Sequence, residues 1–120
     1  MKYKYLGESN LEVSVYCLGS MTWGQGTTEE EGHWQLEHCI SNGINFVDTA
    51  EMYPTNPLRR ETAGETEQII GNWLRKRKRR DEIIIATKVT GEGSKTVRDG
   101  SPISKNTIKV ALEGSLKRLN

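Results

Sequence analysis

The residues with the clearest chemical potential are a carboxylate, a phenol and an amine that follow two strand-like runs. Asp48 ends the run 44–47, and Tyr53 comes five residues after it. Lys88 ends a second run, 83–87. Because parallel α/β proteins handle ligands at the carboxyl ends of their strands, we expect Asp48, Tyr53 and Lys88 to converge on one site.

These three residue types together form an acid–base arrangement. An ammonium beside a phenol favours the phenolate, so such a phenol can donate its proton near neutral pH, while a carboxylate keeps the ammonium charged and oriented. A carbonyl that receives a hydride needs this kind of donor, because negative charge develops on its oxygen. We expect the Asp48–Lys88 pair to be buried, so that loss of Lys88 lowers stability. A second interpretation stays open, in which Asp48 is a helix cap or salt-bridge partner, Tyr53 a loop anchor and Lys88 a surface ion.

Composition and charge exclude several classes of partner. The 120 residues are 34% hydrophobic and 28% charged, which is typical of one soluble globular domain. A formal charge of +1 gives no whole-molecule field that would attract nucleic acid or an anionic membrane. No stretch approaches the ~18 apolar residues of a membrane span, and the first residues lack the apolar core of a signal peptide. We therefore expect a cytoplasmic protein that binds neither nucleic acid nor a membrane.

A basic run at 75–80 raises the alternative of a nucleic-acid-binding segment. However, cations suit the C-terminus of a helix, and no aromatic residues are interleaved for base stacking. We therefore interpret this run as a solvated helix end.

The cysteines and histidines suggest no special chemistry. Cys17 and Cys39 form no CxxC pair and are expected to be reduced core residues. His33 and His38 are five residues apart, whereas two metal ligands on one helical face would be three or four apart. We expect packing or surface histidines and no metal site.

The pattern along the chain predicts a hairpin and then three strand–helix units. Apolar alternation indicates the hairpin over 2–16. The expected strands are 15–18, 44–48 and 83–88, and the expected helices follow the capping residues Thr27 and Thr28, begin near Glu65, and follow Ser104. In the last helix the expected apolar face contains Ile108, Leu112, Ser115, Leu116 and Leu119. Long connections follow the strands and short ones follow the helices, as in a (β/α) barrel.

A doubly wound sheet is the alternative architecture, but no GxGxxG motif follows the first strand. The run 83–88 is apolar at consecutive positions, which predicts burial on both faces of a parallel sheet. Three units cannot close an eight-stranded barrel, for which ~250 residues are typical. We therefore expect an α/β fold of the (β/α)8 TIM-barrel type, here an incomplete barrel, with residues 1–120 as the N-terminal part of one domain. An open strand edge recruits other chains, so we also expect the chain alone to self-associate.

Six segments carry a family resemblance that runs from end to end of the chain. They are YLG at 5–7, LEVS at 11–14, CLGSM at 17–21, GINFVDTAEMY at 43–53, IATK at 85–88 and SLKRL at 115–119. Together they resemble the aldo-keto reductases, and the segments AEMYP at 50–54 and GNWL at 71–74 are similar to the Tas-like branch.

The resemblance implies a (β/α)8 barrel that binds NADPH without a Rossmann motif and reduces a small-molecule carbonyl, an aldehyde or a ketone. By motif match, Tyr53 would be the general acid, Lys88 its pKa partner, and Asp48 the residue that pairs with Lys88 near the nicotinamide. Three residues of the loop after the first strand match positions that approach the cofactor, namely Ser20, Met21 and Gln25.

The resemblance also implies that some functional residues follow position 120. The family's catalytic histidine ends the fourth barrel strand, and most residues that hold the pyrophosphate and adenosine come from the last strands. We therefore expect the chain alone to be inactive and to bind NADPH weakly. The alternative is a non-enzymatic truncated relic, or a subunit that binds a partner through its open sheet edge.

Overall fold

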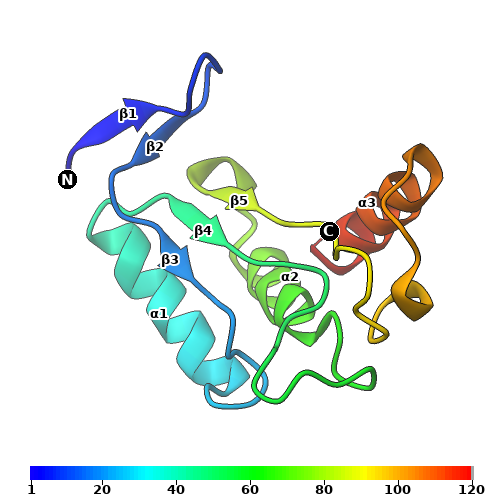
Figure 1. The fold of residues 1–120 in the computed structure, drawn as a ribbon. Coiled ribbons are helices and arrows are strands. Elements are labelled where there is room, and N and C mark those ends of the chain that lie inside the picture. Colours follow the sequence, from blue (N-terminus) through cyan, green and yellow to red (C-terminus); the bar gives the residue numbers. More distant parts are fainter. Residues whose placement is uncertain (120) are drawn as a thin grey trace.

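The computed structural model describes residues 1–119 as a hairpin followed by three strand–helix units (Figure 1). The hairpin pairs β1 (Tyr3–Tyr5) with β2 (Glu12–Ser14). A parallel sheet has the order β3 (Leu18–Gly19), β4 (Phe46–Asp48) and β5 (Ile84–Ala86). The helices are α1 (Glu29–Ser41), α2 (Glu65–Arg77) and α3 (Lys105–Leu119). The predicted α/β class and incomplete barrel are confirmed, since the described residues form a parallel sheet that does not close.

The register of the sheet brings the carboxyl ends of the three strands to one level. Gly19 pairs with Asp48, and Asp48 pairs with Ala86. The connections that follow these strands, 20–28, 49–64 and 87–104, therefore leave the sheet at a common edge. This edge is where the sequence predicted the site to be.

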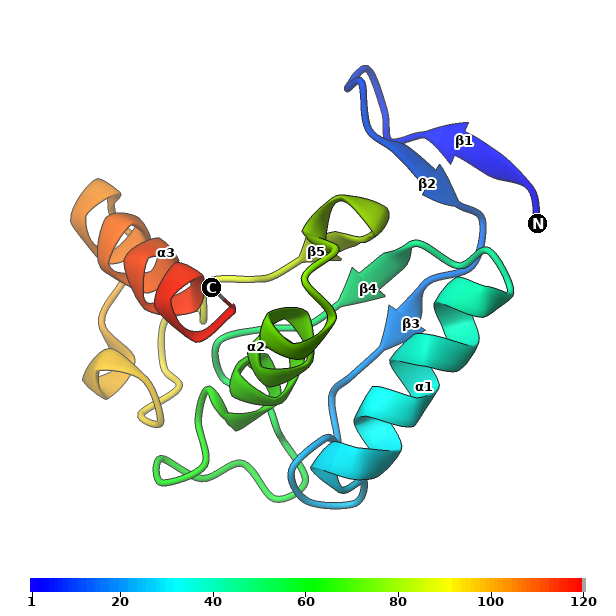
Figure 2. The ribbon, with the colours of Figure 1, turned by 180° about the vertical axis from the view of Figure 1, so that it is seen from behind.

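Helices α1 and α2 cover one face of the sheet, as the view from behind shows (Figure 2). The largest apolar side chains of both helices pack there against the strands. The buried cluster comprises Trp23, Leu36, Val47, Ile69, Ile70, Trp73, Leu74 and Ile83. Burying this much apolar surface is the main stabilising term of the fold.

The loops and helix starts near this core are fixed by side-chain hydrogen bonds. Thr28 begins α1 with the predicted capping box, in which Glu31 is the reciprocal partner. Thr66 Oγ1, at the start of α2, donates to the Trp23 carbonyl at 2.7 Å and is buried. The loop after β3 is therefore held against α2.

The prediction that both cysteines are core residues is wrong for Cys17. Cys17 is exposed rather than in the core, because the first strand of the parallel sheet starts at Leu18, one residue after this cysteine, and not at Val15 as predicted. Cys39 is partly buried, and neither thiol forms a disulfide within residues 1–119. Burial also raises the pKa of the Cys39 thiol above its ordinary value.

The strand predicted to be buried on both faces is only partly so. Ile83 is 2% exposed, but the residues of β5 are half-buried. Among the described residues, helices α1 and α2 cover one face of the sheet. In addition, β5 is the edge strand, and no strand of residues 1–119 pairs with its outer side.

The predicted apolar face of α3 is mostly not the buried one. Ala111 and Ser115 are buried, whereas Ile108, Leu112 and Leu116 are exposed. Helices α2 and α3 pack against each other, and they approach very closely where Gly71 meets the backbone of Arg118 and Leu119. In the part of the chain that the structure describes, no helix is both long and apolar enough to cross a membrane.

Replacing Gly71 with alanine should destabilise the α2–α3 packing. A Cβ at Gly71 would lie 1.9 Å from the Arg118 carbonyl oxygen, so the backbone of α3 would have to move. Overpacking of this kind costs roughly 1–3 kcal/mol. Thermal melting followed by circular dichroism should give a clearly lower Tm than wild type. Gly91→Ala is the control, because a Cβ there meets no atom within 4 Å, and equal melting of both variants would contradict the packing.

Candidate active site

The strand register brings Asp48 and Lys88 together at the carboxyl edge of the sheet. Asp48 is the last residue of β4, and Lys88 comes two residues after the end of β5. Lys88 Nζ donates to both carboxylate oxygens of Asp48 at 2.7 Å. Thr49 N donates to the Ala86 carbonyl at 2.9 Å, so the backbone pairing continues past the strand ends.

Tyr53 reaches the same place from the loop after β4. Its backbone N donates to the Ala50 carbonyl at 3.2 Å, and its carbonyl accepts from Gly64 N at 3.1 Å. Lys88 Nζ lies 4.9 Å from the centre of the Tyr53 ring. The structure therefore brings together all three residues that the sequence predicted to converge.

The Asp48–Lys88 pair is half exposed, so the prediction of a buried pair is wrong. The side chains are 41% and 46% exposed, because both lie at the open end of the strands. Partial burial disfavours the charged lysine, but interactions with Asp48 and Tyr53 outweigh it and raise the pKa of Lys88. A lysine whose pKa is raised in the folded state stabilises the fold at every pH below the ordinary lysine pKa. This contribution is lost as the pH rises through the raised pKa.

The residues predicted to approach a cofactor fall into two groups. Ser20 is 1% exposed, and both its Oγ and its N donate to the Asp48 carbonyl, at 2.7 and 3.2 Å. Gln25 Nε2 donates to the Pro57 carbonyl at 2.8 Å, while its Oε1 accepts from Asn56 N at 3.0 Å. Ser20 and Gln25 thus hold the backbone around the site.

Met21 belongs to the second group, because its side chain remains free to contact a ligand. It is 50% exposed just after the carboxyl end of β3. The Met21 carbonyl accepts from Thr55 N at 3.3 Å, so the loop that carries Tyr53 is also attached here. The Asp48 carboxylate, which binds Lys88, is also half exposed and accessible to a ligand.

Sequence reasoning missed a carboxylate that lies between Asp48 and Tyr53. The side chain of Glu51 is 2% exposed and pairs with Arg98, which is 47 residues away. Burial alone would raise the pKa of Glu51, but Arg98 and the Thr90 amide lower it below its ordinary value. No local pattern in the sequence indicates this partner.

A second buried carboxylate, Glu67, was also missed. It is fully buried on α2, and it accepts from Arg118 Nε and from Thr87 Oγ1, each at 2.6 Å. Thr87 precedes Lys88, so this carboxylate fixes the chain next to the lysine. A signal existed, because Glu67 lies on the helical stripe of Ile70 and Leu74 and therefore faces the core.

Both histidines, and Arg77 of the basic run, contact other groups of the protein. His33 Nε2 lies 2.9 Å from the Ile69 carbonyl, and His38 stacks on Trp34. Residues 1–119 contain no group of histidines, cysteines and carboxylates that could hold a metal ion. Arg77, within the run 75–80, pairs with Glu37 and Glu82.

Comparisons with known proteins agree with this fold. The model of the Aldo/keto reductase family matches residues 16–120. Protein tas of Escherichia coli (strain K12) is 44% identical over 122 residues, which cover 99% of this chain and 35% of that protein. The uncharacterized oxidoreductase YrpG of Bacillus subtilis (strain 168) is 39% identical over 123 residues, covering 99% and 36%.

A solved structure shows the same arrangement in space. The putative aldo-keto reductase from Pseudomonas aeruginosa superposes with a TM-score of 0.72 at 30% identity, covering 98% of this chain and 41% of that one. The chain thus spans about a third of the length of the curated relatives it matches. Because the family model extends over most of its residues, including Asp48, Tyr53 and Lys88, the chain belongs to the aldo/keto reductase family.

Proposed function

We propose that this chain is part of an NADPH-dependent reductase of aldehydes or ketones, in which Tyr53 is the general acid. The observation that carries the proposal is the contact set of Lys88, whose Nζ binds both oxygens of Asp48 and lies over the Tyr53 ring. Family membership supports the reaction class.

Each of the three side chains would have a separate role in the proton transfer to the substrate. NADPH, when bound, supplies the hydride. The Tyr53 hydroxyl donates its proton to the substrate's carbonyl oxygen as negative charge develops there, which gives the alcohol and leaves a phenolate. The Lys88 ammonium stabilises that phenolate, and water re-protonates it at this open edge. Asp48 keeps Lys88 charged and oriented through its two hydrogen bonds.

Two accessible side chains that follow or end the parallel strands could contact the nicotinamide end of the cofactor. Met21 presents an exposed thioether and Asp48 a half-exposed carboxylate, so both can contact a ligand. Ser20 would act indirectly, by holding the Asp48 backbone, and Gln25 by holding the loop at 56–57.

A chimera tests the function without depending on the chain alone. In it, residues 1–120 replace the matching segment of E. coli Protein tas, which is 44% identical. We expect the chimera to oxidise NADPH only when an aromatic or aliphatic aldehyde or ketone is added. The control is the same mixture without the carbonyl compound. A folded chimera that binds NADPH but reduces none of these compounds would argue against the proposal.

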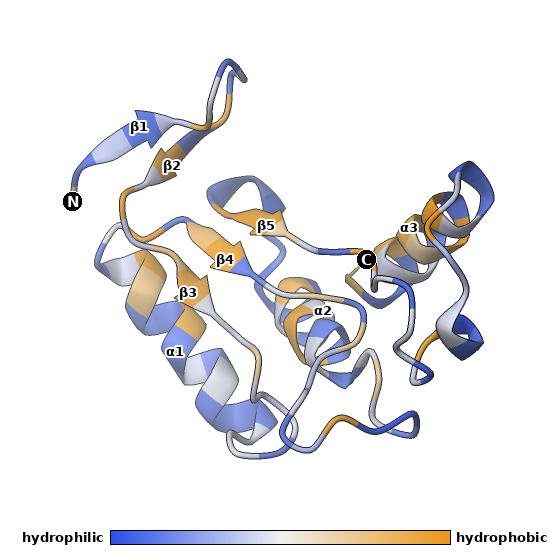
Figure 3. Ribbon diagram, in the orientation of Figure 1, coloured by the Kyte–Doolittle hydropathy of each residue, from blue (hydrophilic) through white to orange (hydrophobic). Residues whose placement is uncertain are grey.

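A second role, association with another copy of the chain, is favoured by the uncovered face of α3. Ile108, Leu112 and Leu116 are 44%, 51% and 58% exposed, and Figure 3 shows the apolar residues of this helix. The outer edge of β5 is also unpaired within the described chain. With a net charge of +1, copies repel one another only weakly.

We therefore expect the isolated chain to form dimers or larger assemblies. Light scattering coupled to size-exclusion chromatography over a range of concentrations should show masses above the monomer. Leu112→Glu combined with Leu116→Glu should shift the population towards monomer. Lys117→Glu should not, because this exposed lysine lies about 100° or more around α3 from both leucines. A sharp monomer peak at every concentration would rule this role out.

A further inference from the structure

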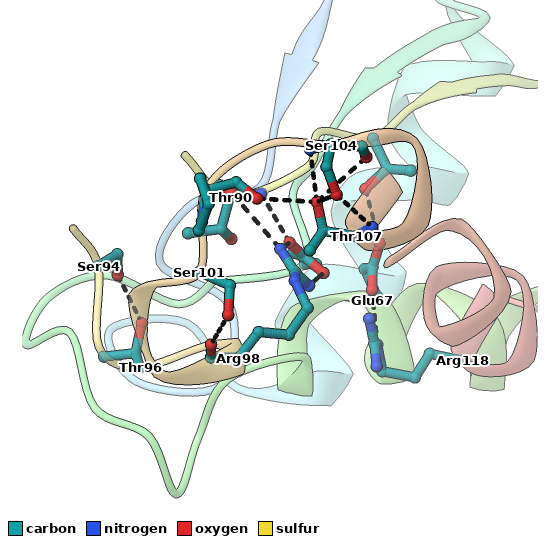
Figure 4. A network of polar contacts seen from close by, with 12 residues as sticks. Glu67, Thr90, Ser94, Thr96, Arg98, Ser101, Ser104, Thr107 and Arg118 are labelled. Carbon is teal, nitrogen blue, oxygen red and sulfur yellow. Dashed lines mark hydrogen bonds and ion pairs between the residues drawn. The ribbon is translucent and has the colours of Figure 1, made fainter. Parts of the chain in front are cut away.

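A buried ion pair joins the two loops that carry Tyr53 and Lys88. The side chains of Glu51 and Arg98 are 2% and 17% exposed. Arg98 Nη1 donates to Glu51 Oε2 at 2.6 Å, and Arg98 Nη2 donates to Oε1. Thr90 N donates to the same Oε1 at 2.6 Å. Figure 4 shows Arg98 beside Thr90 in the polar network of this loop.

The backbone of Glu51 makes a second connection to the same strand end. Its N–H donates to the Lys88 carbonyl at 3.2 Å. Glu51 therefore contacts residue 88 through its main chain and residue 90 through its side chain. Tyr53 lies only two residues further along, and its N–H donates to the Ala50 carbonyl. The loop position of Tyr53 is thus tied to the position of Lys88.

The chain adopts an unfavourable conformation to form this pair. Arg98 and Asp99 have φ values of 48° and 54°, a left-handed conformation that side chains other than glycine adopt rarely. The turn is held by Ser101, whose Oγ and N donate to the Arg98 carbonyl at 2.6 and 3.1 Å. Among the described residues, buried Arg98 Nε has no hydrogen-bond partner.

Buried ion pairs often contribute little to stability, and this one also carries backbone strain and an unpaired Arg98 Nε. Stability alone therefore does not explain the pair. Local strain of this kind persists where the surrounding structure enforces it, often at functional sites. We propose that Glu51, Arg98 and the Thr90 amide form a clamp that positions the Tyr53 phenol relative to the Lys88 ammonium. The clamp deepens the proposed reductase function and rests on it for its catalytic consequence. Glu51 and Arg98 are positioning residues, since neither touches the reacting atoms.

Hydrogen exchange tests the clamp independently of any catalytic activity. In Arg98→Ala, measured in the chain and in the chimera, the amides of residues 51 and 90 should exchange at least about tenfold faster than in wild type, because a charge-assisted contact is lost. The Ile84 amide, which donates to Asn45 at 2.7 Å, should keep its rate. Glu82→Gln is the matched control, because it removes a paired carboxylate at the opposite end of β5.

Turnover by the chimera tests the positioning role. A displacement of about 1 Å can cost 10²-fold in rate, so Arg98→Ala should lower kcat by about that factor while the KM for the aldehyde changes little. Guanidinium ion at sub-denaturing concentration should restore part of kcat, since Arg98 and Glu51 line a cavity of about 350 Å³ through which it can enter. Arg98→Lys should be intermediate, and Glu82→Gln should match wild type.

Unchanged exchange at residues 51 and 90 in Arg98→Ala and in the milder Glu51→Gln would overturn the clamp. A kcat equal to wild type in both variants would overturn its positioning role. If a folded wild-type chimera binds NADPH but proves inactive, the proposed function fails, and the exchange rates still decide whether the clamp exists.

Discussion

Tyr53→Phe is expected to lower kcat of the chimera roughly 10²- to 10⁴-fold, the range for removal of a general acid. Affinity for NADPH should stay nearly unchanged, because the phenol acts on the substrate oxygen and the ring remains in place. Steady-state reduction of an aromatic aldehyde, together with titration of NADPH fluorescence, measures both quantities. Tyr16→Phe is the control, because Tyr16 is 67% exposed and lies outside the predicted site. Unchanged turnover in Tyr53→Phe would remove Tyr53 from the mechanism.

Lys88→Met should also reduce kcat, by roughly 10²- to 10³-fold, the range for loss of one electrostatic stabiliser in an active site. The stability change should be small, about 0–1 kcal/mol, because the Asp48–Lys88 pair is half exposed. Turnover and Tm of the chimera measure the two effects separately.

Lys109→Met is the matched control for that variant, since it removes an exposed lysine that pairs with Glu113 on α3. Full activity in Lys88→Met would identify Lys88 as a surface ion. A Tm several degrees below wild type would instead indicate that the pair is buried in the chimera.

Much of the fold could be predicted because its signals are local. The capping residue Thr28, the start of α2 at Glu65 and the hairpin are set by neighbouring residues. The face of α3 could not be predicted in this way. Ala111 and Ser115 are buried while the larger Leu112 and Leu116 are exposed, and which side of α3 is covered depends on the tertiary structure.

The candidate site also has one part that the sequence predicts and one part that it does not. Asp48 ends β4 and Lys88 follows β5 by two residues, so parallel pairing of two recognisable strands is sufficient to bring them together. Glu51 and Arg98 are different, because their contact depends on a left-handed turn in a long loop. Neither the composition of that loop nor the spacing of its residues specifies such a turn. The exposure of the Asp48–Lys88 pair likewise depends on what surrounds the strand ends.

The pH dependence of kcat/KM, compared between the wild-type chimera and Tyr53→Phe, tests the central claim most directly. If Tyr53 is the general acid, the wild-type rate falls at alkaline pH as the donor loses its proton. The low residual rate of Tyr53→Phe should lack that fall, because the ionising group is gone. The same alkaline fall in both proteins would contradict the account and assign the proton to another group.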